Sequence, residues 1–329
     1  MDGGGVAEER ERHNRKRLRL TWDVAPPPSE QAEGNERDGE DFEAGPPPAP
    51  VLRGHVSPPR RDDDPEGHYV FSLGENLTPR YKILSKMGEG TFGRVLECWD
   101  RQTREYVAIK VVRSIQKYRD AAMIEIDVLQ RLSKNDKGSS GCVKMLNWFD
   151  YRNHICIVFE KLGPSLFDIL KRNKYTSFPV DLVREFGRQL LESVACLGWT
   201  YPCDIWSVGC ILVELCSGEV LFQTHENLEH LAMMERVLGH LPEHMIRRAN
   251  RGAEKYFKQS RLNWPEGAVS RESIRAVRKL DQLKNLISRH VDSSRSSLVD
   301  LLHGFLKFDP CERLTARQAL EHPFFKNQT

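Results

Sequence analysis

Four residues in the first half of the chain have types and spacing that could bind phosphate. Gly88, Gly90 and Gly93 form the pattern G-x-G-x-x-G-x-V, and Lys110 follows in V-A-I-K, fifteen residues after Val95. Glycines have no Cβ, so the backbone N–H groups around them can approach phosphate oxygens closely. A lysine on a strand adds a fixed positive charge. The pattern predicts a site for nucleotide phosphates, although a loose hairpin can carry the same glycine spacing.

The segments around these residues read as strands. Apolar residues of the run 81–84 precede the glycines and those of the run 95–98 follow them, which predicts two strands joined by a turn. A third β-branched run, 107–112, carries Lys110. No helix follows the glycines, which disfavours a dinucleotide-binding βαβ unit, and V-A-I-K favours a kinase-type nucleotide lobe.

A helix and a hairpin follow the lysine. The segment Tyr118–Leu132 has apolar residues at helical spacing, and Glu125 lies in its middle. A glutamate there can pair with Lys110 and orient it on the phosphates; the alternative is an ordinary surface glutamate. Residues 143–150 and 154–160 read as a hairpin. Residues 159–162, at the end of this hairpin, resemble a kinase hinge. In such a hinge the backbone groups of Glu160 and Leu162 would face adenine.

The second half of the chain reads as helices. Apolar spacing predicts helices at 165–173, 180–195, 227–239, 296–306 and 316–321. The segment Asp204–Ser217 is apolar nearly all round, which predicts a buried central helix. Residues 251–264 are basic and aromatic, which is typical of either a surface segment or an insert on the substrate side.

Length and composition limit the class of protein. The 329 residues are enough for a flexible arm and one two-lobed domain, and Lys+Arg 49 nearly balances Asp+Glu 47. Eight scattered cysteines with no C-x-x-C pair are typical of buried free thiols in a reducing compartment. No apolar run reaches membrane-spanning length, so we expect a soluble intracellular protein without membrane contact.

The first 67 residues are rich in Gly, Pro and charged side chains, which predicts a disordered arm. The run RERHNRKRLR at Arg10–Arg19 includes Arg15, Lys16, Arg17 and Arg19. This cluster favours a nuclear-import signal read by an import receptor, over a solvated charge run or weak nucleic-acid contact. We therefore expect a nuclear protein, otherwise a cytoplasmic one, and no direct nucleic-acid binding.

Longer motifs add a family resemblance. EHLAMMER at Glu229–Arg236, with GEGTFGRV, VAIK, HICIVFEKLG and YPCDIWSVGCILVELCSG, resembles the LAMMER, or Cdc-like, dual-specificity protein kinases. The basic run before LTWD at residues 20–23 looks most like the plant members. The resemblance implies an α+β, bilobal kinase fold, with an arm at 1–67, a β-rich N-lobe at 68–162 and a mainly helical C-lobe at 163–329.

The resemblance also implies ligands and partners. The family uses ATP with Mg²⁺, phosphorylates Ser/Arg-rich splicing factors and autophosphorylates on tyrosine. The residues that it assigns to nucleotide binding are Met87, Gly88, Glu89, Gly90, Thr91, Phe92, Gly93, Arg94, Val95, Ala108, Lys110, Glu125, Phe159, Glu160 and Leu162.

One block of the family pattern is absent from the chain. The helix expected at 180–195 runs through residues 196–203 into the helix at 204–217, with no H-[RT]-D-L-K-P-E-N, D-F-G or A-P-E between them. Asp41-Phe42-Glu43 lies in the arm, and His290-Val291-Asp292 lacks the lysine and asparagine that should follow. We assign no catalytic residue and no Mg²⁺ ligand, and we expect weak ATP binding and no phosphotransfer. Arg313 also loses the A-P-E glutamate that it pairs with in relatives, which predicts a less stable C-lobe.

Three readings of the whole chain remain open. The first is a catalytically inactive kinase that keeps its nucleotide site. The second is a splice or gene-model product without a function. The third is a nuclear interaction module that acts through the basic arm.

Overall fold

The computed structural model describes residues 61–135, 141–196, 202–224, 226–291 and 296–326. The import signal expected at Arg15–Arg19 and the first sixty residues of the expected arm lie outside these ranges. Residues 61–67 were also expected to belong to the arm, but they make defined contacts with the N-lobe. Described structure therefore begins before the boundary expected at His68.

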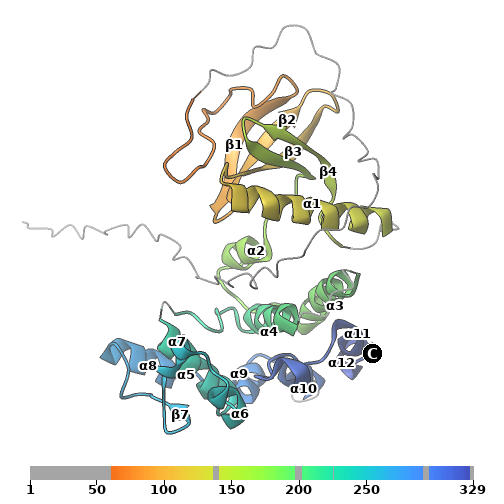
Figure 1. Cartoon of the computed structure of the whole chain (residues 1–329). Coiled ribbons are helices and arrows are strands. Elements are labelled where there is room, and N and C mark those ends of the chain that lie inside the picture. Colours follow the sequence, from red (N-terminus) through yellow and green to blue (C-terminus); the bar gives the residue numbers. More distant parts are fainter. Residues whose placement is uncertain (1–60, 136–140, 197–201, 225, 292–295, 327–329) are drawn as a thin grey trace, which may run out of the picture. The chain divides into compact units, whose positions relative to one another are not determined.

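The N-lobe contains one five-stranded antiparallel sheet with the strand order β1-β2-β3-β5-β4 (Figure 1). The strands are β1 (Tyr81–Gly90), β2 (Gly93–Asp100), β3 (Glu105–Val112), β4 (Met145–Tyr151) and β5 (His154–Glu160). Each expected strand is present. The register pairs Val95 on β2 with Lys110 on β3, which brings the glycine turn beside the lysine strand.

The two faces of this sheet pack against different segments, because side chains alternate along a strand. On one face, Leu96 and Cys98 form a cluster with Tyr69 and Leu77, which precede β1. On the other face, α1 (Gln116–Asn135) buries Ala122 and Ile126 against β3 and β5. The face covered by α1 is also the face on which Lys110 meets Glu125.

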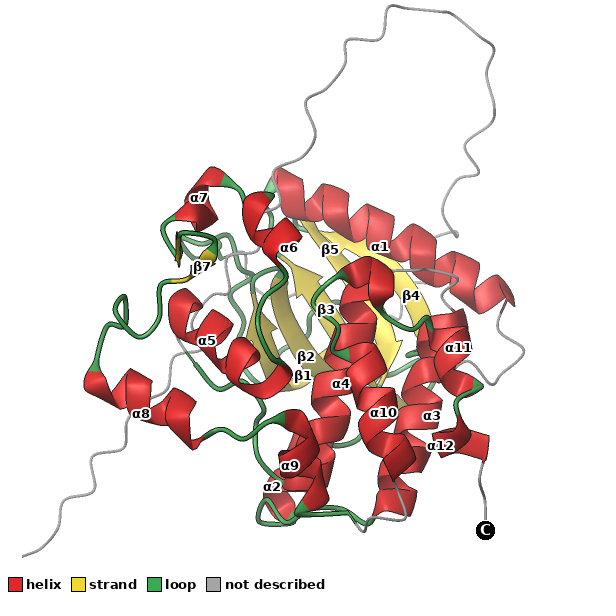
Figure 2. Cartoon of the chain, turned by 90° about the horizontal axis from the view of Figure 1, so that it is seen from below, coloured by secondary structure: helices red, strands yellow, loops and turns green. Residues whose placement is uncertain are grey.

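The C-lobe is helical, and its core is built around α4. The main helices are α2 (Leu166–Arg172), α3 (Val180–Cys196), α4 (Pro202–Ser217), α5 (Asn227–Leu238), α10 (Ser296–Phe305), α11 (Ala316–Leu320) and α12 (Pro323–Lys326). Helices α3, α4 and α10 lie side by side (Figure 2). Helix α4 is buried along most of its length, as its apolar sequence predicts. Gly209 permits this packing, since a Cβ there would lie 2.9 Å from Leu306 and 3.0 Å from Phe305.

Between α5 and α10 the structure holds elements that the sequence pattern does not reveal. The insert contains α6 (Glu243–Arg247), α7 (Arg251–Glu254), the short strands β6 (Phe257–Lys258) and β7 (Arg261–Leu262), α8 (Arg271–Lys279) and α9 (Leu283–Ser288). Helices α8 and α9 had no sequence prediction. In α8 only Ser273 and Val277 are buried, but the cap at Ser270 and the basic residues of the last turn are helix signals that the sequence prediction missed.

Arg313 keeps hydrogen-bond partners despite the missing family block. Its guanidinium donates to the carbonyl oxygens of Lys307, Pro202 and Phe308, at 2.7, 2.9 and 3.1 Å. The guanidinium carbon also lies 4.9 Å from the centre of the Trp206 ring. The expectation of an unpaired charge was too severe, because backbone carbonyl groups replace the carboxylate as acceptors.

The cysteines are free thiols, but their burial differs from the expectation. Cys98, Cys156 and Cys216 are buried, whereas Cys196, Cys203 and Cys311 are exposed. Position inside an apolar run does not predict burial at the ends of helices, where exposed Cys196 and Cys203 lie. Within the described ranges, no helix is long and apolar enough to cross a membrane.

Candidate nucleotide site

The glycine-rich turn joins β1 to β2 through Thr91 and Phe92, with Gly90 paired to Gly93. The three glycines serve different purposes. A Cβ on Gly93 would lie 2.2 Å from the carbonyl oxygen of Val111, so the close approach of β2 to β3 requires glycine there. A Cβ on Gly88 or Gly90 would meet no atom within 4 Å. The space beside these two glycines is therefore open to a phosphate group.

Lys110 and Glu125 form the expected ion pair. The lysine Nζ donates to both carboxylate oxygens of Glu125, each at 2.7 Å. Strand β3 supplies the lysine and the middle of α1 supplies the glutamate. The two side chains are 23% and 38% exposed, so the ammonium group remains accessible to an anion. The pair fixes the position of the positive charge, and its role in nucleotide binding stays a prediction.

Phe92 at the tip of the glycine turn reaches toward the lysine. Its ring centre lies 5.7 Å from Lys110 Nζ and 5.7 Å from the ring centre of Tyr118 on α1. The Phe92 side chain is 49% exposed. An aromatic ring near an ammonium group is attracted to it by about 0.5–1 kcal/mol at an exposed site. The tip of the turn therefore lies close to Lys110.

The segment expected to act as a hinge continues from β5. Phe159 pairs in register with Ala108 on β3 and packs in the cluster beside α1. The Glu160 N–H already donates to the carbonyl oxygen of Lys144, so it is not available to adenine. Leu162 is 55% exposed, and its backbone has no hydrogen bond to any residue that the structure describes. The backbone groups of Leu162 are free to bind a base, and the roles of Glu160 and Leu162 in adenine binding stay predictions.

The fifteen expected residues come from several elements. Residues 87–95 comprise the end of β1, the turn and the start of β2, Ala108 and Lys110 lie on β3, Glu125 lies on α1, and the last three lie at or after the end of β5. The glycine turn, Lys110 and Glu125 come together. Two of the expected residues do not join this group. Met87 is half exposed, and Arg94 contacts the segment before β1 rather than Lys110.

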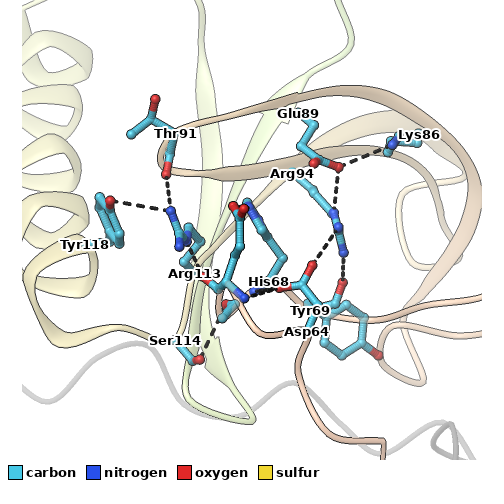
Figure 3. A network of polar contacts seen from close by, with 12 residues as sticks. Asp64, His68, Tyr69, Lys86, Glu89, Thr91, Arg94, Arg113, Ser114 and Tyr118 are labelled. Carbon is cyan, nitrogen blue, oxygen red and sulfur yellow. Dashed lines mark hydrogen bonds and ion pairs between the residues drawn. The ribbon is translucent and has the colours of Figure 1, made fainter. Parts of the chain in front are cut away.

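Sequence reasoning missed Arg113, which bonds to the backbone of the glycine turn (Figure 3). Its guanidinium donates to the Thr91 carbonyl oxygen at 3.2 Å, and its N–H donates to the Phe92 carbonyl oxygen at 3.0 Å. The side chain is almost fully buried, which is rare for arginine. The sequence offered one signal for this role: Arg113 is a charged residue directly after the β-branched run 107–112.

The described residues do not offer a metal site. No group of three or more His, Cys, Asp or Glu side chains in these ranges is close enough to hold a metal ion.

Comparisons with known proteins place this geometry in a family. The family model for the protein kinase domain matches the chain in two segments, residues 81–198 and 197–325. These segments meet between the end of α3 and the start of α4. The crystal structure of a kinase domain superposes with a TM-score of 0.69 and 28% sequence identity, covering 80% of this chain and 100% of that chain.

Relatives show the same match along most of the chain. Serine/threonine-protein kinase AFC3 of Arabidopsis thaliana is 55% identical and covers 96% of both chains. Dual specificity protein kinase CLK2 of Homo sapiens is 35% identical over 80% of this chain and 67% of its own length. The alignment with AFC3 spans 402 residues whereas this chain has 329, so at least 73 aligned positions of AFC3 (402 less 329) have no counterpart here. The chain belongs to the LAMMER, or Cdc-like, family of protein kinases.

Proposed function

We propose that this chain is a nucleotide-binding LAMMER kinase that does not transfer phosphate. The observation that carries the proposal is the junction between α3 and α4, where the two family-model segments meet. The sequence there contains no aspartate of a catalytic loop, no asparagine of that loop and no D-F-G aspartate. Phosphoryl transfer needs these groups to accept the hydroxyl proton and to hold the metal.

The remaining residues of the site do not replace the missing ones. General-base catalysis contributes roughly 10²–10⁴-fold, and loss of one charge-stabilising donor alone costs about 10²–10³-fold in rate. Lys110 carries a positive charge and cannot accept a proton, and the carboxylate of Glu125 is bound to that ammonium group. Transfer should therefore fall below measurable rates.

Nucleotide binding rests on groups that the chain retains. The open space at Gly88 and Gly90, the accessible Lys110 ammonium and the unbonded backbone of Leu162 fit phosphate and adenine. Without metal ligands, the triphosphate charge meets Lys110 almost alone, so binding is weak.

The first experiment measures binding and transfer in the same preparation. Thermal unfolding of the purified chain is recorded with ATP in EDTA, with ATP and magnesium, and with Lys110→Met as the matched variant. We expect ATP to raise Tm equally with and without magnesium, and Lys110→Met to abolish this rise. Transfer is assayed on an Arg/Ser-rich peptide, with AFC3 as the positive control. Magnesium-dependent transfer that Lys110→Met removes would overturn the proposal.

We further propose that the chain is nuclear and competes for the Ser/Arg-rich partners of its active relatives. The basic cluster of Arg15, Lys16, Arg17 and Arg19 supports import, and the family resemblance supports the partner class. Replacing these four residues with alanine should move a tagged protein to the cytoplasm. Unchanged nuclear signal would contradict the import role. Absence of any cooperative unfolding transition would instead favour a non-functional product.

A further inference from the structure

A segment before β1 is joined to the glycine turn through two arginines. Arg94 lies on the face of the sheet that packs against this segment, and Arg113 also contacts Tyr118 on α1. We call residues 61–69 the brace. Figure 3 shows how the brace meets two arginines, Arg94 on β2 and Arg113 just after β3. Lys110 and Leu96 lie in strands of the same sheet, but Lys110 meets α1 whereas Leu96 packs toward the segment before β1. The brace is therefore built to act on the turn without touching the nucleotide.

Arg94 joins the brace to the tip of the glycine turn. Its Nε donates to Glu89 Oε2 at 2.8 Å, its Nη1 to the carbonyl oxygen of Tyr69 at 2.9 Å, and its Nη2 to Asp64 Oδ2 at 2.8 Å. One planar guanidinium thus holds one residue of the turn and two residues of the brace. Such fixed, charge-assisted contacts are about twice as strong as neutral hydrogen bonds.

Arg113 makes a second link between the same two segments. It donates through Nη1 to the Thr91 carbonyl oxygen and through Nε to the carbonyl oxygen of Glu66 in the brace. Its own N–H donates to the Phe92 carbonyl oxygen. One residue therefore holds both backbone carbonyl groups at the tip of the turn, that of Thr91 through its guanidinium and that of Phe92 through its backbone N–H.

The brace itself is anchored at both ends. The buried His154 ring contacts Asp63 Oδ1 through Nε2 at 2.9 Å and the Val112 carbonyl oxygen through Nδ1 at 2.7 Å. Both partners are hydrogen-bond acceptors, so the ring links the brace to the end of β3. At the other end, Ser114 N–H donates to the carbonyl oxygen of Gly67 at 2.9 Å, and Tyr69 is buried in the core.

Arg94 also affects the charge that the glycine turn places near a phosphate group. Glu89 lies between two of the open turn positions, and its carboxylate would repel a triphosphate. The hydrogen bond from Arg94 lowers the pKa of Glu89, and Lys86 adds a second contact at 3.2 Å. Arg94 therefore holds this negative charge paired and on the brace side of the turn.

We propose that the brace positions the glycine turn for nucleotide phosphates, with Arg94, Arg113 and Asp64 as positioning residues. This inference rests on the proposed nucleotide binding. A turn that is already held in place loses less conformational freedom when phosphate binds, so docking of the brace should favour nucleotide binding, and the coupling is reciprocal. We expect the effect to concern the phosphates, because the contacts described above join the brace to Arg94, Arg113, Ser114 and His154.

The test uses the full chain and the variant Asp64→Asn. Asp64 Oδ1 accepts the N–H groups of Glu66 and His68, so asparagine can keep the local turn while its amide faces the Arg94 donors. Asp64→Glu is the rescue variant. Asp150→Asn is the matched control, because Asp150 pairs with Arg119 elsewhere in the same lobe. Affinities for ATP and for adenosine are measured in EDTA, and hydrogen exchange is measured without ligand.

We expect Asp64→Asn to weaken ATP binding by about threefold to tenfold and to leave adenosine binding unchanged. We also expect faster exchange of the amides of residues 90–93, with Tm close to wild type, partial recovery in Asp64→Glu and no change in Asp150→Asn. Equal loss for ATP and adenosine, or unchanged exchange in the turn, would overturn the brace. If wild type binds neither ligand, the proposed function fails, and the exchange rates alone decide whether the brace holds the turn.

Discussion

Lys110 Nζ lies 2.7 Å from each carboxylate oxygen of Glu125, although the chain lacks the metal-binding and catalytic segments of its family. The pair depends only on β3 and α1, two elements of the N-lobe. Its presence shows that the loss of the catalytic block leaves the local geometry of the lysine intact. Nucleotide binding and phosphate transfer can therefore be tested separately.

Replacing Glu125 should uncouple the lysine from α1. Glu125→Gln removes the charge that holds Nζ, and we expect ATP affinity to fall several-fold because Lys110 loses its fixed position. Stability should change by less than about 1 kcal/mol, since the glutamate side chain is 38% exposed. Titration calorimetry in EDTA measures the affinity. Asp127→Asn, which breaks the exposed pair with Arg131 on the same helix, serves as the control and should bind ATP like wild type.

Two glycines of the turn should respond oppositely to alanine. Gly93→Ala forces a Cβ to within 2.2 Å of a backbone oxygen and should destabilise the N-lobe by about 1–3 kcal/mol. Gly90→Ala meets no atom, so stability should stay within about 0.5 kcal/mol of wild type while ATP binding weakens. Urea unfolding and ATP titration of both variants separate the two effects. Similar Tm losses in both variants would contradict this division of roles.

The contacts of Arg313 should matter for the C-lobe. Arg313→Lys keeps the positive charge but cannot donate to three carbonyl groups in one plane or stack on Trp206 in the same way. We expect a loss of about 1–3 kcal/mol in the free energy of unfolding. Arg317→Lys, at an exposed position on α11, is the control and should unfold like wild type. Wild-type stability in Arg313→Lys would mean that its carbonyl contacts contribute little.

Asp100 should make N-lobe stability depend on pH in the acid range. Burial alone would raise its pKa, but hydrogen bonds from Arg80 and from the N–H of Gln102 outweigh burial and lower it. A lowered folded-state pKa stabilises the fold above the ordinary carboxyl pKa of about 4, and this contribution is lost as pH falls through the lowered value. Asp100→Asn should therefore reduce stability at neutral pH by about 1.5–3 kcal/mol.

The measurement for Asp100 is urea unfolding between pH 3 and 7. The difference between wild type and Asp100→Asn should shrink below about pH 4, because wild type then loses the same charge. Asp120 is exposed on α1, so the free energy of unfolding of Asp120→Asn should change with pH in the same way as that of wild type. A constant difference at every pH would show that the charge of Asp100 does not carry the effect.

Much of the N-lobe could be read from the sequence because its signals are local. Alternating apolar residues around Gly88–Gly93 give the strands, and one lysine and one glutamate fifteen residues apart give the ion pair. The brace could not be read in this way. Its acidic residues look like part of a polar arm, and their partners, Arg94 and His154, lie 30 and 91 residues away from Asp64 and Asp63.

The C-lobe shows the same limit. The apolar helix α4 was evident from composition, whereas α8 is marked by its cap Ser270 and its charge pattern rather than by a long apolar run. The hydrogen-bond acceptors of Arg313 are the backbone carbonyl groups of Pro202, Lys307 and Phe308. Because every residue has a backbone carbonyl group, such acceptors cannot be recognised from the sequence. Sequence reasoning named the residue that loses its family partner, but only the structure shows what takes the partner's place.

The alternation of side chains along β2 gives the N-lobe a practical property. Even-numbered positions such as Arg94 and Leu96 meet the segment before β1, while odd-numbered positions such as Val95 do not belong to that contact. A dye attached to the brace would report whether the glycine turn is ordered, without lying beside Lys110. The same strand could therefore be redesigned as a nucleotide sensor, with the signal taken from one side and the specificity changed on the other.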